Sequence, residues 1–157
     1  MRPLLTACLT AFLALSLPIG TPGERCAKAQ QGPSVEPGQT FTGKVAEVTD
    51  GDTFKVDRPV GPVVKVRLWG VDAPEFDQPY GVKARDAAIG YISRKTMSVQ
   101  VVDVDRYGRA VVRVKVRGGN LRQMLVCRGL AWHYDEYAPN ASQLARLERQ
   151  ARSAAVL

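Results

Sequence analysis

Short stretches in which apolar and polar residues alternate, many of them β-branched, dominate the chain between residues 41 and 116. A period of two predicts β-strands, because successive side chains of a strand point to opposite faces of a sheet. Turn residues such as Asp50-Gly51-Asp52 separate the first stretches, which predicts an antiparallel meander. We expect five strands, at residues 41–48, 53–56, 63–69, 97–104 and 110–116.

One helical pattern interrupts these strands, and two more follow them. The helices are expected at residues 79–94, 121–128 and 142–154. In the first, Val82, Ile89 and Ile92 fall near one face, and Asn120 is a suitable N-cap for the second. Five strands with one interposed helix follow the element order of a small OB-fold barrel. The predicted fold class is therefore α+β, a five-stranded OB-fold β-barrel with about three helices packed on it.

The first residues have the pattern of a secretory signal peptide. An uncharged Leu-rich stretch from Leu4 to Leu17 precedes an A-x-A site at residues 27–29. An uncleaved membrane anchor is the alternative, but the apolar stretch is shorter than the ~20 residues of a spanning helix. We therefore divide the chain into a signal peptide, a flexible Pro- and Gly-rich linker and a folded domain, at residues 1–29, 30–39 and 40–157.

Cleavage before Gln30 would give an exported protein, secreted or periplasmic, with no stable association with the membrane. We expect it to be a monomer. Cys127 would then be its only thiol, so the domain cannot form an internal disulfide. The apolar run around Cys127 predicts that this side chain lies in the core.

Charge limits the function further. The chain carries 22 Lys and Arg against 15 Asp and Glu, a net charge of +7. Loss of the signal peptide removes Arg2, Arg25 and Lys28 but only Glu24, so +5 remains. This excess favours an anionic partner such as nucleic acid or a lipid surface. His133 is the only histidine, which excludes a mechanism with two imidazoles as acid and base.

Acidic and basic residues gather at strand ends and turns, where a rigid scaffold presents functional groups to solvent. Each group alone is also explained as a turn or a solvated side chain. Together they would make a site for phosphodiester hydrolysis, in which three carboxylates share a hard cation and two arginines bind a phosphate. The groups are Asp50-Gly51-Asp52-Thr53, Arg67, Val71-Asp72-Ala73-Pro74-Glu75 and Tyr107-Gly108-Arg109.

These motifs and Gly129-Leu130-Ala131, in this order, resemble the staphylococcal-nuclease-like (thermonuclease) family over residues 41–154. The resemblance implies a nuclease that uses Ca²⁺ to hydrolyse single- or double-stranded DNA and RNA and leaves 3′-phosphates. It places the calcium ligands on Asp52, Asp72 and the main-chain carbonyl of Ala73. It also makes Glu75 the general base, Arg67 and Arg109 the phosphate-binding arginines, and Tyr107 and Tyr137 the lining of the nucleotide pocket.

A non-catalytic module remains the alternative, since OB-fold barrels also bind nucleic acid or oligosaccharide without chemistry. The three acids favour the enzyme, because convergent carboxylates repel phosphate unless a metal lies between them. One departure from the family pattern concerns base stacking. Asp135 and Glu136 stand near a position where the prototype has an aromatic residue, so stacking would depend on Tyr137.

Overall fold

The computed structural model describes residues 35–154. The predicted signal peptide at residues 1–29, and the predicted linker up to residue 34, lie outside the described residues. Residues 35–39 contact the barrel: Val35 is buried, and Gly38 N–H donates to the carbonyl of Val101 at 2.9 Å. No helix within the described range is long and apolar enough to cross a membrane.

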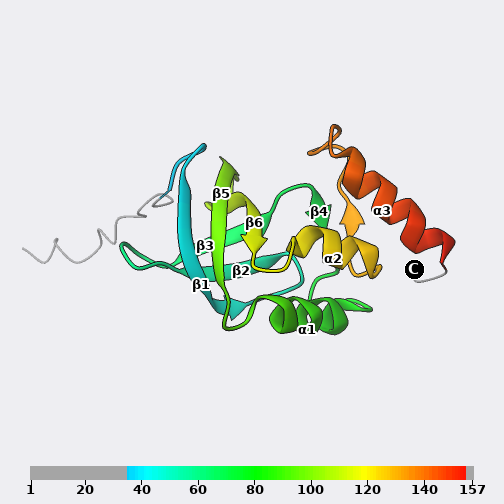
Figure 1. Cartoon of the computed structure of the whole chain (residues 1–157), viewed down its shortest axis with the longest axis horizontal. Coiled ribbons are helices and arrows are strands. Elements are labelled where there is room, and N and C mark those ends of the chain that lie inside the picture. Colours follow the sequence, from blue (N-terminus) through cyan, green and yellow to red (C-terminus); the bar gives the residue numbers. More distant parts are fainter. Residues whose placement is uncertain (1–34, 155–157) are drawn as a thin grey trace, which may run out of the picture. The chain divides into compact units, whose positions relative to one another are not determined.

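The predicted β-barrel is confirmed. Five strands close in the order β1-β2-β3-β6-β5 (Figure 1). All neighbouring pairs are antiparallel except β3 and β6, which run parallel. The strands span Thr40–Val48 (β1), Thr53–Asp57 (β2), Val64–Leu68 (β3), Thr96–Val104 (β5) and Ala110–Val116 (β6), within one or two residues of the predicted bounds.

The barrel encloses the hydrophobic core with one face of each strand. Buried side chains of β6, for example, alternate with half-buried or exposed ones, as expected for a closed sheet whose outer face contacts solvent. The interior is filled mainly by valines, whose β-branched side chains pack well on a pleated surface. The large side chains that are at most 1% exposed include Phe54, Val56, Val66, Leu68, Val99, Val101 and Val112.

Residues 35–154 contain three helices: α1 (Gly81–Ile92), α2 (Leu121–Cys127) and α3 (Ser142–Ser153). Helix α2 lies between the barrel and α3 (Figure 1) and packs against both α1 and α3. As predicted, the Asn120 side chain caps α2, accepting from the N–H of Arg122 at 3.1 Å. The α+β barrel with its packed helices is thus as expected.

Two details of the helices differ from the prediction. Ile92 is buried as predicted and Ile89 packs against the core, but Val82 is 49% exposed. The other buried residues of α1 are Gly81, Ala84 and Ala88. Gly81, Ala84 and Ala88, small residues three and four positions apart, form one stripe that lets the helix approach the barrel closely and leaves Val82 outside. Cys127 is exposed, because α2 directs Leu121, Leu125 and Val126 inward and ends at Cys127.

The structure also contains a second, two-stranded sheet that the sequence did not predict. Strand β4 (Val71–Asp72) pairs antiparallel with β7 (Trp132–His133). Each strand has only two residues, which is too short to show an alternating pattern. This sheet joins the segment after β3 to the segment before α3, and so brings Asp72 and the tyrosines near residue 137 into one region.

Candidate active site

The turn between β1 and β2 holds two carboxylates in fixed positions. Oδ1 of Asp50 accepts from the N–H groups of Asp52 and Thr53 at 3.2 and 2.7 Å, so the side chain closes its own turn. Gly51 is required between the two acids, because a Cβ there would lie 2.8 Å from Cβ of Ala73. Asp50 is 4% exposed and Asp52 is 1% exposed.

Both oxygens of the Asp52 carboxylate accept hydrogen bonds. Oδ1 accepts from the Thr53 hydroxyl at 2.9 Å, and Oδ2 accepts from the Ala73 N–H at 3.0 Å. Arg67 also contacts Asp52, with Nη1 3.3 Å from Oδ1 and Nη2 3.3 Å from Oδ2. The second partner of Arg67 is Asp72, whose Oδ1 accepts from Nη2. Arg67 therefore bridges two acids, Asp52 in the β1–β2 turn and Asp72 in strand β4.

Glu75 projects from the segment between β4 and α1 and is exposed to solvent. Its main chain is held at both ends: the N–H donates to Oε1 of Gln78 at 3.0 Å, and the carbonyl accepts from the Gln78 N–H at 2.9 Å. A Cβ on Gly81 would lie 1.8 Å from the Glu75 carbonyl oxygen, so only glycine fits at the start of α1. Helix α1 thus fixes the backbone from which Glu75 extends.

The carboxylates of this group raise one another's proton affinity. Burial raises the pKa of Asp52, the positive charge of Arg67 opposes the shift, and the nearby Asp50 adds to it. Burial and then the charge of Asp50 raise the pKa of Glu75. Negative charge therefore exceeds what Arg67 neutralises, and a cation among these acids would relieve the excess.

The donor set suits calcium in its chemistry, since carboxylate and carbonyl oxygens are the ligands that this hard cation prefers. Within residues 35–154, however, no group of three or more His, Cys, Asp or Glu side chains is arranged to hold a metal ion. Asp52 and Asp72 face Arg67, so a cation would compete with this guanidinium for their oxygens.

A cleft of about 670 Å³ opens on the other side of Arg67. Its lining includes Arg67, Arg109, Tyr107, Tyr134 and Tyr137. Tyr107 and Tyr137 are 69% and 65% exposed, so their rings are available to a ligand. An open cleft with aromatic walls and two arginines is suited to a nucleotide, whose base stacks and whose phosphate pairs with guanidinium groups.

Asp105 positions Arg109 at the rim of this cleft. Its Oδ1 accepts from the N–H groups of Tyr107 and Arg109, both at 2.9 Å, and its Oδ2 accepts from Nε of Arg109 at 2.7 Å. The carboxylate thereby holds the turn that connects β5 to β6 and one edge of the guanidinium. No hydrogen bond to Nη1 or Nη2 of Arg109 occurs in the described part of the chain.

The structure places the eight predicted site residues in two adjoining groups that share Arg67. The acidic group contains Asp52, Asp72, Ala73 and Glu75 around Arg67. The cleft group contains Tyr107, Arg109 and Tyr137 beside Arg67. No described contact joins Arg109 directly to the acids.

Sequence reasoning did not assign site roles to Asp50, Asp105 and Tyr134. Asp50 was visible in the Asp-Gly-Asp turn, and Asp105 precedes the Tyr-Gly-Arg turn. No sequence pattern marked Tyr134 as a site residue. Its ring contacts that of Tyr137 because the chain turns between them, with the Ala138 N–H donating to the Tyr134 carbonyl. Their ring centroids lie 4.8 Å apart. The stacking surface thus has a second ring beside Tyr137.

Comparisons with known proteins agree with this geometry. The family model described as staphylococcal nuclease homologue matches residues 65–156. Protein ParB of Escherichia coli is 37% identical over 120 residues, which cover 70% of this chain and 67% of ParB. An uncharacterized endonuclease of Escherichia coli O157:H7 is 38% identical over 96 residues, covering 60% of this chain and 62% of that protein.

A probable staphylococcal-like nuclease, CAN1, of Oryza sativa subsp. japonica is 39% identical over 89 residues, which are 57% of this chain. The match spans 27% of that plant protein, so the two share one domain rather than their full length. The family model covers more than half of the chain, including Arg67, Asp72, Glu75 and Arg109. The chain belongs to the staphylococcal nuclease homologue family.

Proposed function

We propose that the protein is a calcium-dependent nuclease that hydrolyses phosphodiester bonds of DNA and RNA and leaves 3′-phosphates. The observation that carries the proposal is the shared position of Arg67, which touches Asp52 and Asp72 on one side and lines the cleft with Arg109 on the other. A phosphate that reaches Arg67 from the cleft lies next to the acids. Family membership and endonuclease relatives support the same reaction.

Glu75 is the proposed general base. Its carboxylate is exposed beside Asp50 and Asp72, and its raised pKa brings it closer to the pH at which a base is most efficient. It would orient a water molecule and take its proton as the oxygen attacks phosphorus. The bond from phosphorus to the 5′ oxygen then breaks, the 5′ oxygen takes a proton from solvent and leaves as a hydroxyl group, and the 3′ oxygen keeps the phosphate.

Arg67 and Arg109 are proposed to hold the phosphate and stabilise the charge that develops in the transition state. Arg109 reaches it with the edge of its guanidinium that Asp105 leaves free. Calcium, held by Asp52, Asp72 and the carbonyl of Ala73, would polarise the phosphate and offset its charge. Tyr107 and Tyr137, with Tyr134 beside them, would stack against the bases next to the cleaved bond.

We extend the proposal to the location and assembly of the protein. The pattern of residues 1–29 supports export to the periplasm or the medium, followed by action as a monomer without membrane attachment. Export also agrees with the choice of metal, because calcium is far more available outside the cytoplasm than within it.

The test is cleavage of end-labelled single-stranded DNA and RNA by the purified protein with calcium, with magnesium or with excess chelator. We expect cleavage with calcium, little with magnesium, and none with chelator, since a loose set of oxygen ligands suits calcium better than the strict octahedron of magnesium. Products should lose their terminal phosphate to a 3′-phosphatase. Binding without cleavage in calcium would instead identify a non-catalytic module, and equal rates in both metals would contradict the calcium assignment.

A further inference from the structure

The outer face of β6 carries a row of basic side chains that leads away from the cleft. Ala110, Val112, Val114 and Val116 point inward and are buried. The alternate positions point outward, and beyond Val111 they are all basic. We call Arg113, Lys115 and the following Arg117 the β6 basic row.

The neighbouring strands contribute polar but uncharged side chains to the same face. Across β5, Gln100 stands opposite Arg113 and Ser98 stands opposite Lys115. Across β1, Thr40 and Thr42 continue these two cross-strand rows. Neither of these two cross-strand rows contains a carboxylate. The side chains of Gln100, Ser98, Thr40 and Thr42 are all exposed. Hydroxyl and amide groups of this kind donate hydrogen bonds to phosphate oxygens.

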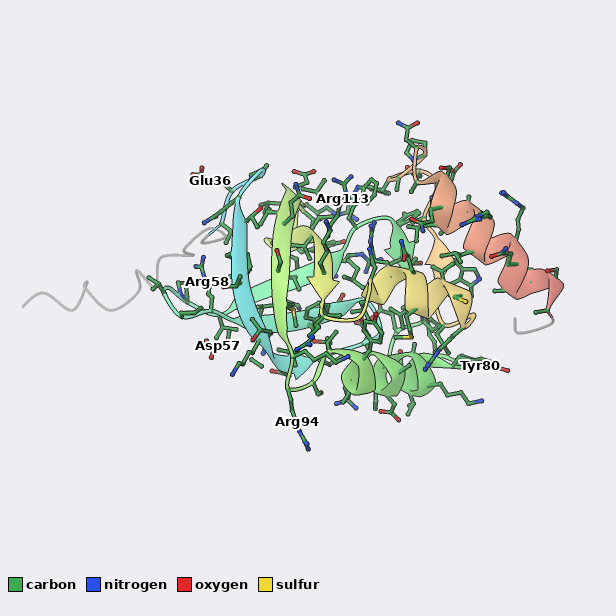
Figure 2. All side chains as sticks on the ribbon, viewed as in Figure 1. Glu36, Asp57, Arg58, Tyr80, Arg94 and Arg113 are labelled. Carbon is green, nitrogen blue, oxygen red and sulfur yellow. The ribbon has the colours of Figure 1, made fainter. Side chains whose placement is uncertain are left out.

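The basic row has no acidic partner of its own. Within the part of the chain that the structure describes, Arg113, Lys115 and Arg117 form no ion pair. Like charges that lie along one strand repel each other, so the concentration of charge in this row does not itself stabilise the fold. Figure 2 shows Arg113, the first residue of the row, well away from Arg94 and from Asp57 and Arg58 at the β2–β3 turn.

A buried arginine adds to the positive charge behind the row. The guanidinium carbon of Arg113 lies 4.0 Å from the ring centroid of Trp69, and that of Arg122 lies 5.1 Å from it. Arg122 is 8% exposed, and its Nε has no hydrogen-bond partner among the described residues. Burial and then the charge of Arg113 lower the pKa of Arg122 to about 10. An anion near Arg113 would relieve this repulsion.

The row is continuous with the cleft. Arg109, Val111 and Arg113 alternate along one face of β6, and a strand rises about 3.3 Å per residue, so Arg113 lies about 13 Å beyond Arg109. Val111 and Trp69 both line the cleft. Val111 stands opposite Arg67 in the parallel pairing of β3 with β6. A chain held at Arg109 therefore reaches Arg113 past Val111, where Asp103 on β5 is the opposite residue. Beyond that point, the residues opposite Arg113 and Lys115 are uncharged.

We propose that the β6 basic row binds the phosphodiester backbone of a nucleic-acid strand as it leaves the cleft, and so extends the substrate site by several nucleotides. The inference rests on the proposed nuclease function and specifies where the strand runs. An anionic membrane is the other polyanion that such a row could meet. The nucleic acid is favoured because the row begins at the cleft and is flanked by side chains that donate to phosphate, with Trp69 between the two.

The experiment compares two triple variants with the same loss of charge. The row variant is Arg113→Gln, Lys115→Gln and Arg117→Gln. The control is Arg128→Gln, Arg146→Gln and Arg149→Gln, three exposed arginines on or next to α2 and α3. Binding of a single-stranded oligonucleotide of about 20 residues is measured in chelator over a range of salt concentrations. Each lost phosphate contact makes the negative slope of log K against log salt shallower by about 0.7. The slope should therefore become shallower by about 2 in the row variant and should not change in the control.

A second readout uses substrate length. With calcium, the row variant should cleave the long oligonucleotide with a raised KM but a trinucleotide at the wild-type rate, because a trinucleotide does not reach the row. The double variant Lys115→Gln and Arg117→Gln keeps Arg113 on Trp69, so it tests the inference even if the triple variant misfolds. The decrease in its salt slope should be about two thirds of the decrease in the row variant. Melting curves of all variants check the fold.

The outcomes separate this inference from the proposed function. If the wild type cleaves and the row variant and control have equal slopes, the row does not bind nucleic acid and the inference is wrong. If nothing is cleaved but the slope falls only in the row variant, the nuclease proposal fails and the row stands. If the row variant no longer binds phosphatidylglycerol vesicles but keeps the wild-type salt slope for the oligonucleotide, the row binds a membrane and the inference is overturned.

Discussion

The two halves of the candidate site are built in opposite ways. In the acidic half, Asp50 and Asp52 are almost fully buried, and backbone N–H groups hold both carboxylates. In the cleft half, Tyr107 and Tyr137 are more than half exposed, and one carboxylate, Asp105, positions Arg109. Only Arg67 belongs to both halves.

This difference separates what the fold must hold from what the substrate can organise. Buried acids that raise one another's proton affinity destabilise the fold until a cation joins them, so their geometry has to be fixed by the backbone. The exposed aromatic rings are solvated by water in the free protein, and Arg109 is already paired with Asp105. These groups therefore add binding without that destabilisation. Variants in the acidic half should therefore change the rate and the pH dependence, whereas variants in the cleft half should also weaken binding of the substrate in the absence of metal.

The largest effect is expected at Glu75. Glu75→Gln keeps the shape of the side chain but removes the proton acceptor, so turnover should fall by roughly 10²–10⁴-fold. Binding of an uncleavable oligonucleotide should be retained or tightened, because a negative charge next to the phosphate is lost. The measurement is single-turnover cleavage alongside equilibrium binding. Asp77→Asn, an exposed acid two residues away, is the control and should cleave like the wild type. Wild-type cleavage by Glu75→Gln would remove Glu75 from the mechanism.

The two arginines should differ in when they contact phosphate. Both Nη atoms of Arg67 contact Asp52 or Asp72, whereas Arg109 is held through Nε. Lysine keeps the charge but not the planar fork, so either Arg→Lys variant should lower turnover by about 10²–10³-fold.

Binding in chelator should separate the pair. Arg109→Lys should weaken binding of an uncleavable dinucleotide by about tenfold, the loss expected for a charge-assisted bond. Arg67→Lys should leave that binding nearly unchanged until calcium is added, because Arg67 is occupied by the acids until a cation takes its place. Equal losses for both variants in chelator would show that Arg67 is already free to meet the phosphate.

The barrel was predictable because each strand has one buried face. In β6, Val112, Val114 and Val116 alternate with Arg113 and Lys115, and the alternation alone identifies the strand. The β4–β7 sheet was not predictable, since two-residue strands have no period and their pairing joins segments 60 residues apart. On α1, Ile89 and Ile92 were placed correctly and Val82 was not, because hydrophobicity points to Val82 whereas close packing selects Ala84 and Ala88.

The sequence predicts which residues form the candidate site, but it does not predict their contacts. The spaced motifs that contain Asp52, Asp72 and Arg109 identify the family. No pattern in the sequence shows that Arg67 bridges Asp52 and Asp72, because the choice between a cation and a guanidinium depends on distances in the folded chain. The same is true of the pair of rings made by Tyr134 and Tyr137.

The smallest effect concerns stability, and its sign follows from the buried acids. Burial raises the pKa of Asp52 from its ordinary value of 3.8 to about 7, and the pKa of Glu75 is raised as well. The folded, calcium-free protein thus binds protons more tightly than the unfolded chain between about pH 4 and pH 7. The free energy of unfolding must therefore fall as pH rises through this window, by an amount on the order of 1–3 kcal/mol.

Urea unfolding at pH 4.5 and pH 7.5, with chelator and with calcium, measures this change. Calcium should restore stability most at pH 7.5, where the acids have lost the protons with which the metal competes. Asp52→Asn removes the main titrating group, so it should flatten the pH dependence and abolish the calcium effect. Asp86→Asn, an exposed acid on α1, should change neither. A free energy of unfolding that rises between pH 4.5 and pH 7.5 in chelator would contradict this prediction. It would mean that Arg67 neutralises the acids fully, so that the acidic half does not destabilise the fold in the absence of calcium.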